Sequence, residues 1–146
     1  MATIPALPTH LTLEIVTPDR KVVTEKVDEV EIPGADGYFG VLPGHTPLLA
    51  MLQVGELWYR KGSETVHLAI AFGFAEVLPD RVTILAQFAE KADEIDIARA
   101  EAAKRRAEER VSAPILASEM DYERARIALL KSLIRLQVAT RARTRV

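Results

Sequence analysis

Groups that could hold a ligand are concentrated in one short stretch, residues 89–100, with the sequence AEKADEIDIARA. Carboxylates accept hydrogen bonds, and a guanidinium donates several of them in a planar fork. A stretch that places both kinds of group so close together is a candidate ligand site. Its charged members include Glu90, Asp93, Glu94, Asp96 and Arg99.

Three further acids, Asp28, Glu29 and Glu31, surround the apolar pair Val30 and Ile32. Paired carboxylates can bind a metal ion or act in acid–base catalysis. No histidine or second acidic cluster lies nearby in the sequence to complete such a site. Because Val30 and Ile32 share one face of a strand, we expect the acids to lie on a solvated outer face.

A turn-rich loop occupies residues 33–49, PGADGYFGVLPGHTPLL, in which four glycines and three prolines separate apolar residues. Its glycine spacing fits neither the Rossmann pattern nor the P-loop, because no Gly-Lys-Ser/Thr follows. We therefore do not expect it to cradle a phosphate. The loop's lone histidine, His45, is expected to have a surface or turn-bonding role.

The composition suits a chain that folds in water. Of its 146 residues 49% are hydrophobic, which is enough for one domain, or for a small domain with an appendage. The absence of cysteine excludes a disulfide framework and a thiolate metal site. The N-terminus, MATIPALPTHL, resembles neither a signal nor a transit peptide, and no apolar run approaches the roughly 20 residues of a membrane span. We expect a soluble protein that meets a membrane only through partners.

Enzymatic activity has little support in the sequence. The chain has no cysteine nucleophile, no Gly-x-Ser-x-Gly elbow and no paired histidines. These are usual means of activating a nucleophile. We therefore expect no turnover by the isolated chain.

Charge is distributed unevenly. Residues 1–92 carry 12 acidic and 7 basic side chains, whereas residues 118–146 carry 3 and 7. The basic segment is either a surface for an acidic partner or a solvated helix face. Nucleic acid is a weak candidate partner, because the segment has one aromatic residue, Tyr122, and no recognised binding module.

Alternating apolar and polar residues predict β-strands through the first part of the chain. Pro18-Asp19 and Pro79-Asp80 are expected to form turns. Gly73 is expected to mark a bulge or a close approach of two backbones. Many short strands at this spacing predict an antiparallel sandwich or flattened barrel. The strands are expected around residues 11–15, 22–23, 30–32, 56–60, 65–70, 72–78 and 81–86.

The pattern becomes helical after Phe88. Asp93, with Asp96 as its capping-box partner, is expected to begin a helix over residues 94–110, and Ser118-x-x-Asp121 is expected to begin a second one. Each helix carries an apolar stripe. The stripes consist of Ala98, Ala102 and Ala103 in the first helix and of Ile127, Leu130, Leu133, Ile134 and Val138 in the second.

The predicted fold class is α+β. An N-terminal antiparallel β-sandwich, or flattened barrel, in residues 1–88 precedes a C-terminal antiparallel two-helix hairpin in residues 89–146. A hairpin of this length buries little beyond its own seam and owes most of its stability to packing. We therefore expect the hairpin to be able to open or to move onto another partner.

Three motifs, in this order along the chain, resemble the epsilon subunit family of bacterial F-type ATP synthases. They are GYFGVLPGHTPLL, LAIAFGFAEVLPDRVTILAQFAE and the helix opening Ile95-Asp96-Ile97-Ala98-Arg99-Ala100. The resemblance covers nearly the whole chain, and only the first ten residues and the helical turn look divergent.

The resemblance implies a non-catalytic central-stalk subunit of a proton-translocating ATP synthase, peripheral to the cytoplasmic face of the bacterial plasma membrane. In that family the sandwich binds the gamma subunit and rests near the c-ring, coupling rotation to proton flow. The hairpin is either compact beside the sandwich or extended alongside gamma. The extended hairpin, near the catalytic alpha and beta subunits, blocks ATP hydrolysis.

The resemblance also implies a regulatory ATP site on the folded hairpin, with no cofactor required. The family's Ile/Leu-Asp-x-x-Arg-Ala motif is matched by Ile95, Asp96, Arg99 and Ala100. Glu90 matches an upstream acidic contact, and Arg106 and Arg135 match basic positions used for phosphates.

Two positions depart from the family pattern. Lys131 stands where members that bind ATP tightly carry arginine, and lysine supplies charge without the planar fork. Tyr38 stands where many members carry a carboxylate. Only His45 is therefore carried over to the side that faces the c-ring.

Two alternatives stay open from the sequence. Asp96 could be only a helix cap, with Arg99 as its ion-pair partner. The chain could also be a free-standing nucleotide-sensing adaptor whose sandwich holds an unrelated protein.

Overall fold

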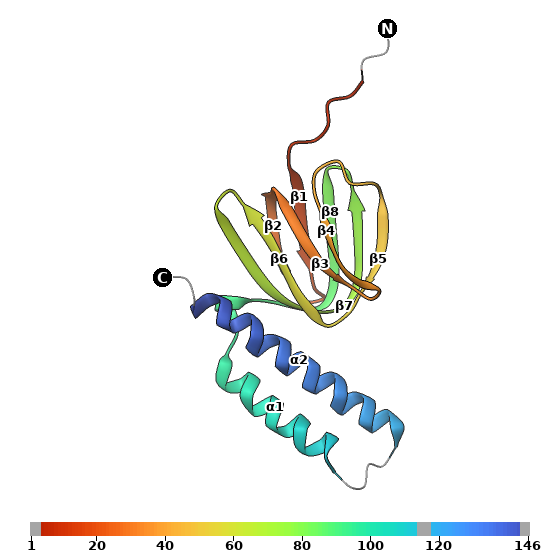
Figure 1. Ribbon diagram of the computed structural model, residues 1–146. Coiled ribbons are helices and arrows are strands. Elements are labelled where there is room, and N and C mark those ends of the chain that lie inside the picture. Colours follow the sequence, from red (N-terminus) through yellow and green to blue (C-terminus); the bar gives the residue numbers. More distant parts are fainter. Residues whose placement is uncertain (1–3, 114–117, 144–146) are drawn as a thin grey trace.

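The computed structural model describes residues 4–113 and 118–143, and it contains a β-sandwich above a pair of helices (Figure 1). The eight strands occupy the first part of the chain, and the helices follow. The strands are β1 Leu11–Val16, β2 Lys21–Val27, β3 Glu29–Gly34, β4 Gly37–Val41, β5 Leu48–Leu52, β6 Gly55–Lys61, β7 Glu64–Leu78 and β8 Arg81–Lys91. The helices are the short 3-10 helix η1 Ala92–Glu94, then α1 Ile97–Val111 and α2 Glu119–Arg143.

The strands follow the order β2-β1-β8-β7-β5-β3-β4, and β6 joins β3 to β7. Hairpins turn at Pro18-Asp19 and at Pro79-Asp80, as the sequence predicts, and their strands pair antiparallel. One neighbouring pair, β1 with β8, is parallel. β8 continues to Lys91, beyond residue 88, where the sequence placed the end of the sandwich.

The predicted strands 65–70 and 72–78 are halves of one long strand, β7. The first half of β7 pairs with β6 and the second with β5, so the strand passes from one side of the sandwich to the other. The pairing partner of β7 changes at Phe72 and Gly73, whose φ angles are 56° and 121°. A Cβ on Gly73 would lie 1.9 Å from the carbonyl oxygen of Leu85, so a close backbone approach excludes any side chain there. The register against β8 is unchanged across this point, so the alternative prediction of a bulge is wrong.

The sandwich has its own core. Alternate residues of β1, Leu11, Leu13 and Ile15, are fully buried, as their spacing predicts. The main cluster of buried apolar side chains contains only residues between Leu11 and Ala89. The core therefore does not depend on the helices.

The first long helix begins later than the sequence predicts. Asp93 lies in η1, and Asp96 is the N-cap of α1, with its Oδ1 accepting a hydrogen bond from the backbone N–H of Arg99 at 3.1 Å. The prediction that Asp93 caps a helix beginning at 94 is wrong, because the extended residue Ile95 separates η1 from α1. Ser118 caps α2 as predicted, accepting from the backbone N–H of Asp121 at 3.2 Å.

Within the hairpin, α1 packs on α2, and α2 packs on the sandwich (Figure 1). The buried residues of α1 are Ala100 and Ala107, whereas Ala98 of the predicted stripe is exposed. On α2, Val138 is buried, but Leu130 and Leu133 are 39% and 42% exposed. The predicted stripe on α2 is therefore only partly buried, because the sandwich covers the C-terminal part of that helix and the N-terminal part extends away from it.

None of the helices in the described ranges combines the length and the apolar character needed to span a bilayer.

Candidate functional site

The predicted nucleotide residues come from β8, the connection after it and the two long helices. Glu90 lies near the end of β8, and Ile95 and Asp96 lie in the connection that follows. The other predicted residues lie on the two helices. They are Arg99, Ala100 and Arg106 on α1 and Lys131 and Arg135 on α2.

Glu90 and Arg135 form a junction between the sandwich and the hairpin. The Arg135 Nη2 lies 3.3 Å from the Glu90 Oε2, and both side chains are largely buried. The guanidinium also lies over the ring of Phe88, with 5.6 Å between its Cζ and the ring centroid. A charge pair in a low-dielectric setting attracts more strongly than one in water, so this contact joins α2 to β8.

Arg135 keeps one donor unused. Its Nε is buried and has no hydrogen-bond partner in the part of the chain that the structure describes. Leaving a buried donor without an acceptor costs free energy.

Lys131 lies one turn before Arg135 on α2 and on a similar side of the helix. Its Nζ is 5.8 Å from the centroid of the Phe72 ring, a cation–π contact. Phe72 is the residue with positive φ where β7 changes partners. Two cations of α2 thus face two aromatic residues of the sandwich.

Asp96 and Arg99 do not form the ion pair that one alternative expected. Asp96 caps α1 through the backbone of Arg99, and no ion pair joins the two side chains in the described ranges. Arg99 and Arg106 are exposed and lie two turns apart, so they project from one side of α1. Ile95 and Ala100 are buried, at 8% and 0% exposure, and have packing roles.

A crevice of about 260 Å³ opens next to Glu90. Arg20, from the turn between β1 and β2, pairs with Glu94 at 2.9 Å along this crevice. Arg99, Arg106 and Lys131 do not line it. The structure therefore joins Glu90 to Arg135 but does not gather all the predicted residues around one cavity. Sequence reasoning missed Arg20, because nothing in a hairpin turn indicates contact with a residue 74 positions away.

The acids near β3 hold strands together. Arg60 of β6 contacts Asp28 at 3.2 Å and Glu29 at 2.9 Å. The hydrogen bond that Arg60 donates to Glu29 raises the pKa of Arg60 above its ordinary value. No group of acids, histidines or cysteines in the described ranges is arranged to hold a metal ion. Asp28 and Glu29 thus pair across strands instead of standing free in solvent.

His45 lies in the loop between β4 and β5, at the end of the sandwich far from the hairpin (Figure 1). Its Nδ1 is 2.6 Å from the carbonyl oxygen of Thr46, which agrees with a turn-bonding role. A hydrogen bond joins this loop to the hairpin of β7 and β8, because the N–H of Gly44 donates to the carbonyl of Pro79 at 2.7 Å.

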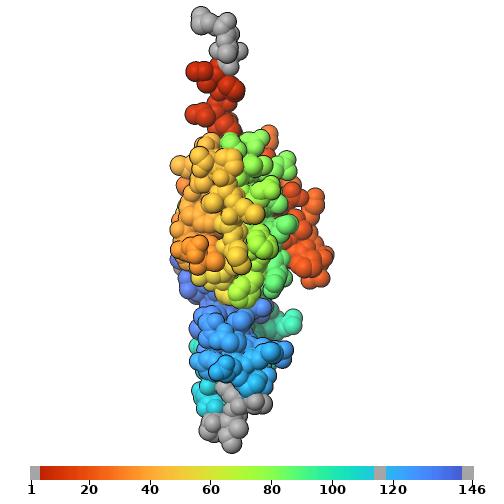
Figure 2. Space-filling model, turned by 90° about the vertical axis from the view of Figure 1, so that its right-hand side faces the viewer, coloured from red at the N-terminus to blue at the C-terminus, as the bar shows by residue number. Residues whose placement is uncertain are grey.

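An apolar row crosses the outer surface of three adjacent strands. Met51 of β5, Phe74 of β7 and Leu85 of β8 are cross-strand neighbours, and they are 62%, 50% and 54% exposed. Leu49, on the same face of β5, is 70% exposed. Figure 2 looks toward β5, in orange-yellow, and the second half of β7, in green. Contiguous exposed apolar side chains are typical of a surface that another protein covers.

Comparisons with known proteins give the same order of domains. Residues 10–92 match the beta-sandwich domain of the ATP synthase delta/epsilon chain, and residues 93–140 match its long alpha-helix domain. The ATP synthase epsilon chain 2 of Syntrophotalea carbinolica is 50% identical over 131 residues, 90% of this chain and 94% of the relative. The epsilon chain of Syntrophobacter fumaroxidans is 53% identical over 127 residues, 87% and 93% of the two chains.

Solved structures agree. A chain in the mitochondrial ATP synthase of Euglena gracilis, in its OSCP/F1/c-ring assembly, superimposes with a TM-score of 0.79 at 26% identity, covering 93% of this chain and 84% of that one. A chain of the central stalk and c-ring of Tetrahymena thermophila mitochondrial ATP synthase shares the fold, with a TM-score of 0.56 at 15% identity, covering 95% and 100% of the two chains.

The sandwich, the hairpin and these matches together define the class of protein: the chain belongs to the delta/epsilon chain family of ATP synthases. Within that family it is of the epsilon type, a non-catalytic subunit of the stalk.

Proposed function

We propose that the chain couples and regulates a proton-translocating bacterial ATP synthase through two separable parts. The sandwich binds the gamma subunit of the central stalk and faces the c-ring. The hairpin inhibits ATP hydrolysis when it leaves the sandwich and extends toward the alpha and beta subunits. ATP bound to the compact hairpin opposes this change. The protein is then peripheral to the cytoplasmic face of the membrane.

The limited attachment of the hairpin carries this proposal. α1 packs on α2, and α2 packs on the sandwich through a small cluster. Its buried members are Ala69, Ile95, Val138 and Ala139. Phe88, Ala92, Ile97 and Ile134 pack against the cluster but are only partly buried. The apolar area enclosed between the hairpin and the sandwich is therefore much smaller than the main core, and its loss costs little compared with unfolding the sandwich.

The junction of Glu90 with Arg135 supports a regulatory role for ATP. Both residues match positions that contact ATP in the family, and the buried Nε of Arg135 has no hydrogen-bond partner among the described residues. A phosphate chain can accept from a guanidinium in a paired arrangement. A ligand that binds only the compact arrangement shifts the population toward it by its difference in affinity. Abundant ATP would thus release inhibition.

The shape of the molecule supports the placement of the partners. The loop of His45 and the hairpin lie at opposite ends of the sandwich (Figure 1). If His45 faces the c-ring, the hairpin points toward the catalytic subunits. The row of Met51, Phe74 and Leu85 lies on a side surface between the ends, where gamma can cover it.

Reconstituted ATPase tests the proposal. We would compare the full chain with a chain ending at Lys91, which keeps all of β8 and the complete main core. We expect faster ATP hydrolysis with the shortened chain than with the full chain. A difference between the two rates that becomes smaller as the ATP concentration rises would support a hairpin released by nucleotide. Equal hydrolysis at every ATP concentration would exclude the inhibitory role. Recovery of the native chain without gamma or catalytic subunits would instead indicate the nucleotide-sensing adaptor.

A further inference from the structure

Glu56 is a buried carboxylate that the nucleotide junction does not use. It lies on β6, and its side chain is 8% exposed. Its backbone N–H donates to the hydroxyl of Tyr38 at 3.2 Å, which fixes the start of the strand. A buried carboxylate is costly unless cations or donors surround it. The neighbours of Glu56 therefore show what compensates this cost.

Four nitrogen atoms converge on the Glu56 carboxylate from two different parts of the protein. Oε1 lies 2.6 Å from the His67 Nδ1, on the adjacent strand β7. The Arg141 Nε donates to Oε1 at 3.1 Å, and its Nη2 donates to Oε2 at 3.3 Å. The Gln137 Nε2 donates to Oε2 at 3.2 Å. Arg141 thus forms a two-point, charge-assisted contact, the stronger kind of hydrogen bond.

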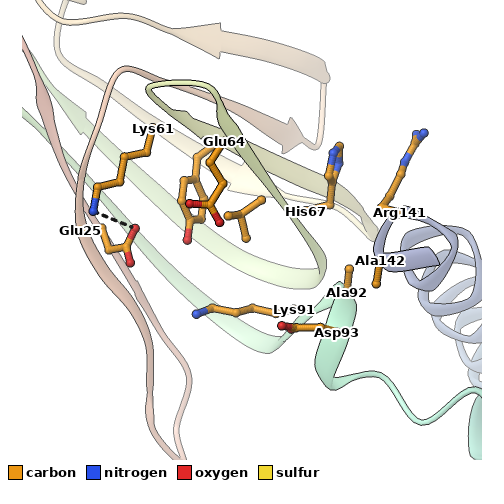
Figure 3. A pocket seen from close by; sticks show the side chains of 11 residues that line it. Glu25, Lys61, Glu64, His67, Lys91, Ala92, Asp93, Arg141 and Ala142 are labelled. Atoms are coloured by element: carbon orange, nitrogen blue, oxygen red, sulfur yellow. Dashed lines mark ion pairs between the residues drawn. The ribbon is translucent and has the colours of Figure 1, made fainter. Parts of the chain in front are cut away.

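The geometry joins the sandwich to one place on the hairpin. Gln137 and Arg141 are one turn apart on α2 and so project from the same side of the helix. Figure 3 shows His67, from the sheet, beside Arg141, from the helix, at the edge of a cavity of about 390 Å³. A second cavity is lined by Glu56 and Trp58, and His67 and Arg141 line it as well. The contact lies between two crevices that water can enter.

We propose that a latch holds the C-terminal end of α2 to the sandwich in the compact state, whether or not nucleotide is bound. The latch consists of the Glu56 carboxylate and the three side chains that contact it, His67, Gln137 and Arg141. This inference rests on the mobile hairpin of the proposed function and specifies its regulation. Within residues 4–113 and 118–143, hydrogen bonds join α2 to the sandwich at two places, Glu90 with Arg135 and the latch. ATP acts at the first, and the latch sets how often the hairpin opens without ATP.

The latch stabilises the compact state because its hydrogen bonds between α2 and the sandwich exist only in that state. In the compact state one carboxylate satisfies donors from both parts of the protein. When α2 leaves, Gln137 and Arg141 must find water instead, and the small cluster of Val138 and Ala139 opens with them. Direct charge-assisted bonds fix one position of α2, whereas an apolar patch alone allows the helix to slide.

Amide hydrogen exchange of the full-length chain, without nucleotide, tests the latch. Glu56→Gln keeps the shape of the side chain and removes its charge, and we expect exchange in residues 134–142 to become about tenfold faster. The matched control is Glu76→Gln on β7, an exposed acid outside the latch, which should leave exchange unchanged. The lone tryptophan, Trp58, lies beside the latch and should change its fluorescence with Glu56→Gln but not with the control.

Arg141→Gln guards against a general folding defect, because the Arg141 side chain is about half exposed and is not part of the main core. We expect this variant to speed exchange to a similar extent and the double variant to add little to either single one. Protection of Leu68 and Ile70 in the sandwich should stay at the wild-type level throughout. Unchanged exchange in residues 134–142 with Glu56→Gln, or additive effects in the double variant, would overturn the latch.

The latch and the proposed function fail differently. If Glu56→Gln opens the hairpin but removal of the hairpin leaves hydrolysis unchanged, the latch stands and the inhibitory role falls. If removal of the hairpin relieves inhibition but Glu56→Gln leaves exchange unchanged, the inhibitory role stands and the latch falls.

Discussion

Arg135 of α2 reaches Glu90 at the end of β8, with 3.3 Å between Nη2 and Oε2, while its guanidinium lies over Phe88. This pair connects residues 45 positions apart and belongs to both the attachment of the hairpin and the candidate nucleotide site. A ligand that engages Arg135 therefore acts on a contact that holds the hairpin to the sandwich. The two roles cannot be changed independently at this position.

Replacing Arg135 should weaken ATP binding and loosen the hairpin together. Arg135→Ala removes a charge-assisted contact to phosphate and leaves Glu90 without its cation, so we expect ATP affinity to fall about tenfold or more. Calorimetric titration with ATP measures the affinity. Arg126→Ala is the control, because Arg126 is on the same helix and pairs with Glu123 within it. Equal affinities for both variants would contradict a role for Arg135 in binding ATP.

Patterns local in sequence predicted much of the fold, but the prediction of a loop over residues 33–49 is wrong, because this segment contains β4 and the first residues of β5. Alternation gave the buried face of β1, and the two proline-aspartate turns and the Ser118 cap are formed as predicted. The start of α1 was misplaced because Asp93 and Asp96 are equally good caps by residue type. After β8 the chain first forms the short helix η1, which contains Asp93, so the cap of α1 falls on Asp96.

Gly73→Ala should strongly destabilise the sandwich. A methyl group there would overlap the carbonyl of Leu85, and the φ of 121° strains any residue with a side chain. We expect the free energy of unfolding to fall by about 2–4 kcal/mol. Urea denaturation followed by circular dichroism measures it. Gly40→Ala is the control, because no atom lies within 4 Å of its added Cβ, and an equal loss in both variants would refute the argument.

Long-range polar contacts could not be predicted from the sequence. Glu56 appeared as an ordinary acid in a strand, and its contacts with Gln137 and Arg141 span 81 and 85 positions. The residues of the nucleotide motif were found through resemblance, yet the structure places Ile95 and Ala100 in packing and Asp96 at a cap. Residue type and spacing do not distinguish a ligand contact from these structural roles.

The apolar row on the sandwich should control binding to gamma. Phe74→Asp places a charge between Met51 and Leu85, so we expect affinity for isolated gamma to fall about tenfold. Surface plasmon resonance with immobilised gamma measures the change. Met120→Asp is the control, since Met120 is 64% exposed at the start of α2, away from the sandwich. Unaltered binding of Phe74→Asp would exclude this face as the contact.

Lys131→Arg should tighten ATP binding. Lys131 lies over Phe72, one turn from Arg135, and the family members that bind ATP tightly carry arginine at this position. Arginine keeps the charge and the aromatic contact and adds a planar fork for phosphate oxygens, so we expect affinity to rise about three- to tenfold. Calorimetry measures the affinity, with Lys104→Arg on α1, where the lysine pairs with Glu108, as the control. If Lys131→Arg binds ATP no more tightly than the wild type, the phosphates do not lie beside Lys131.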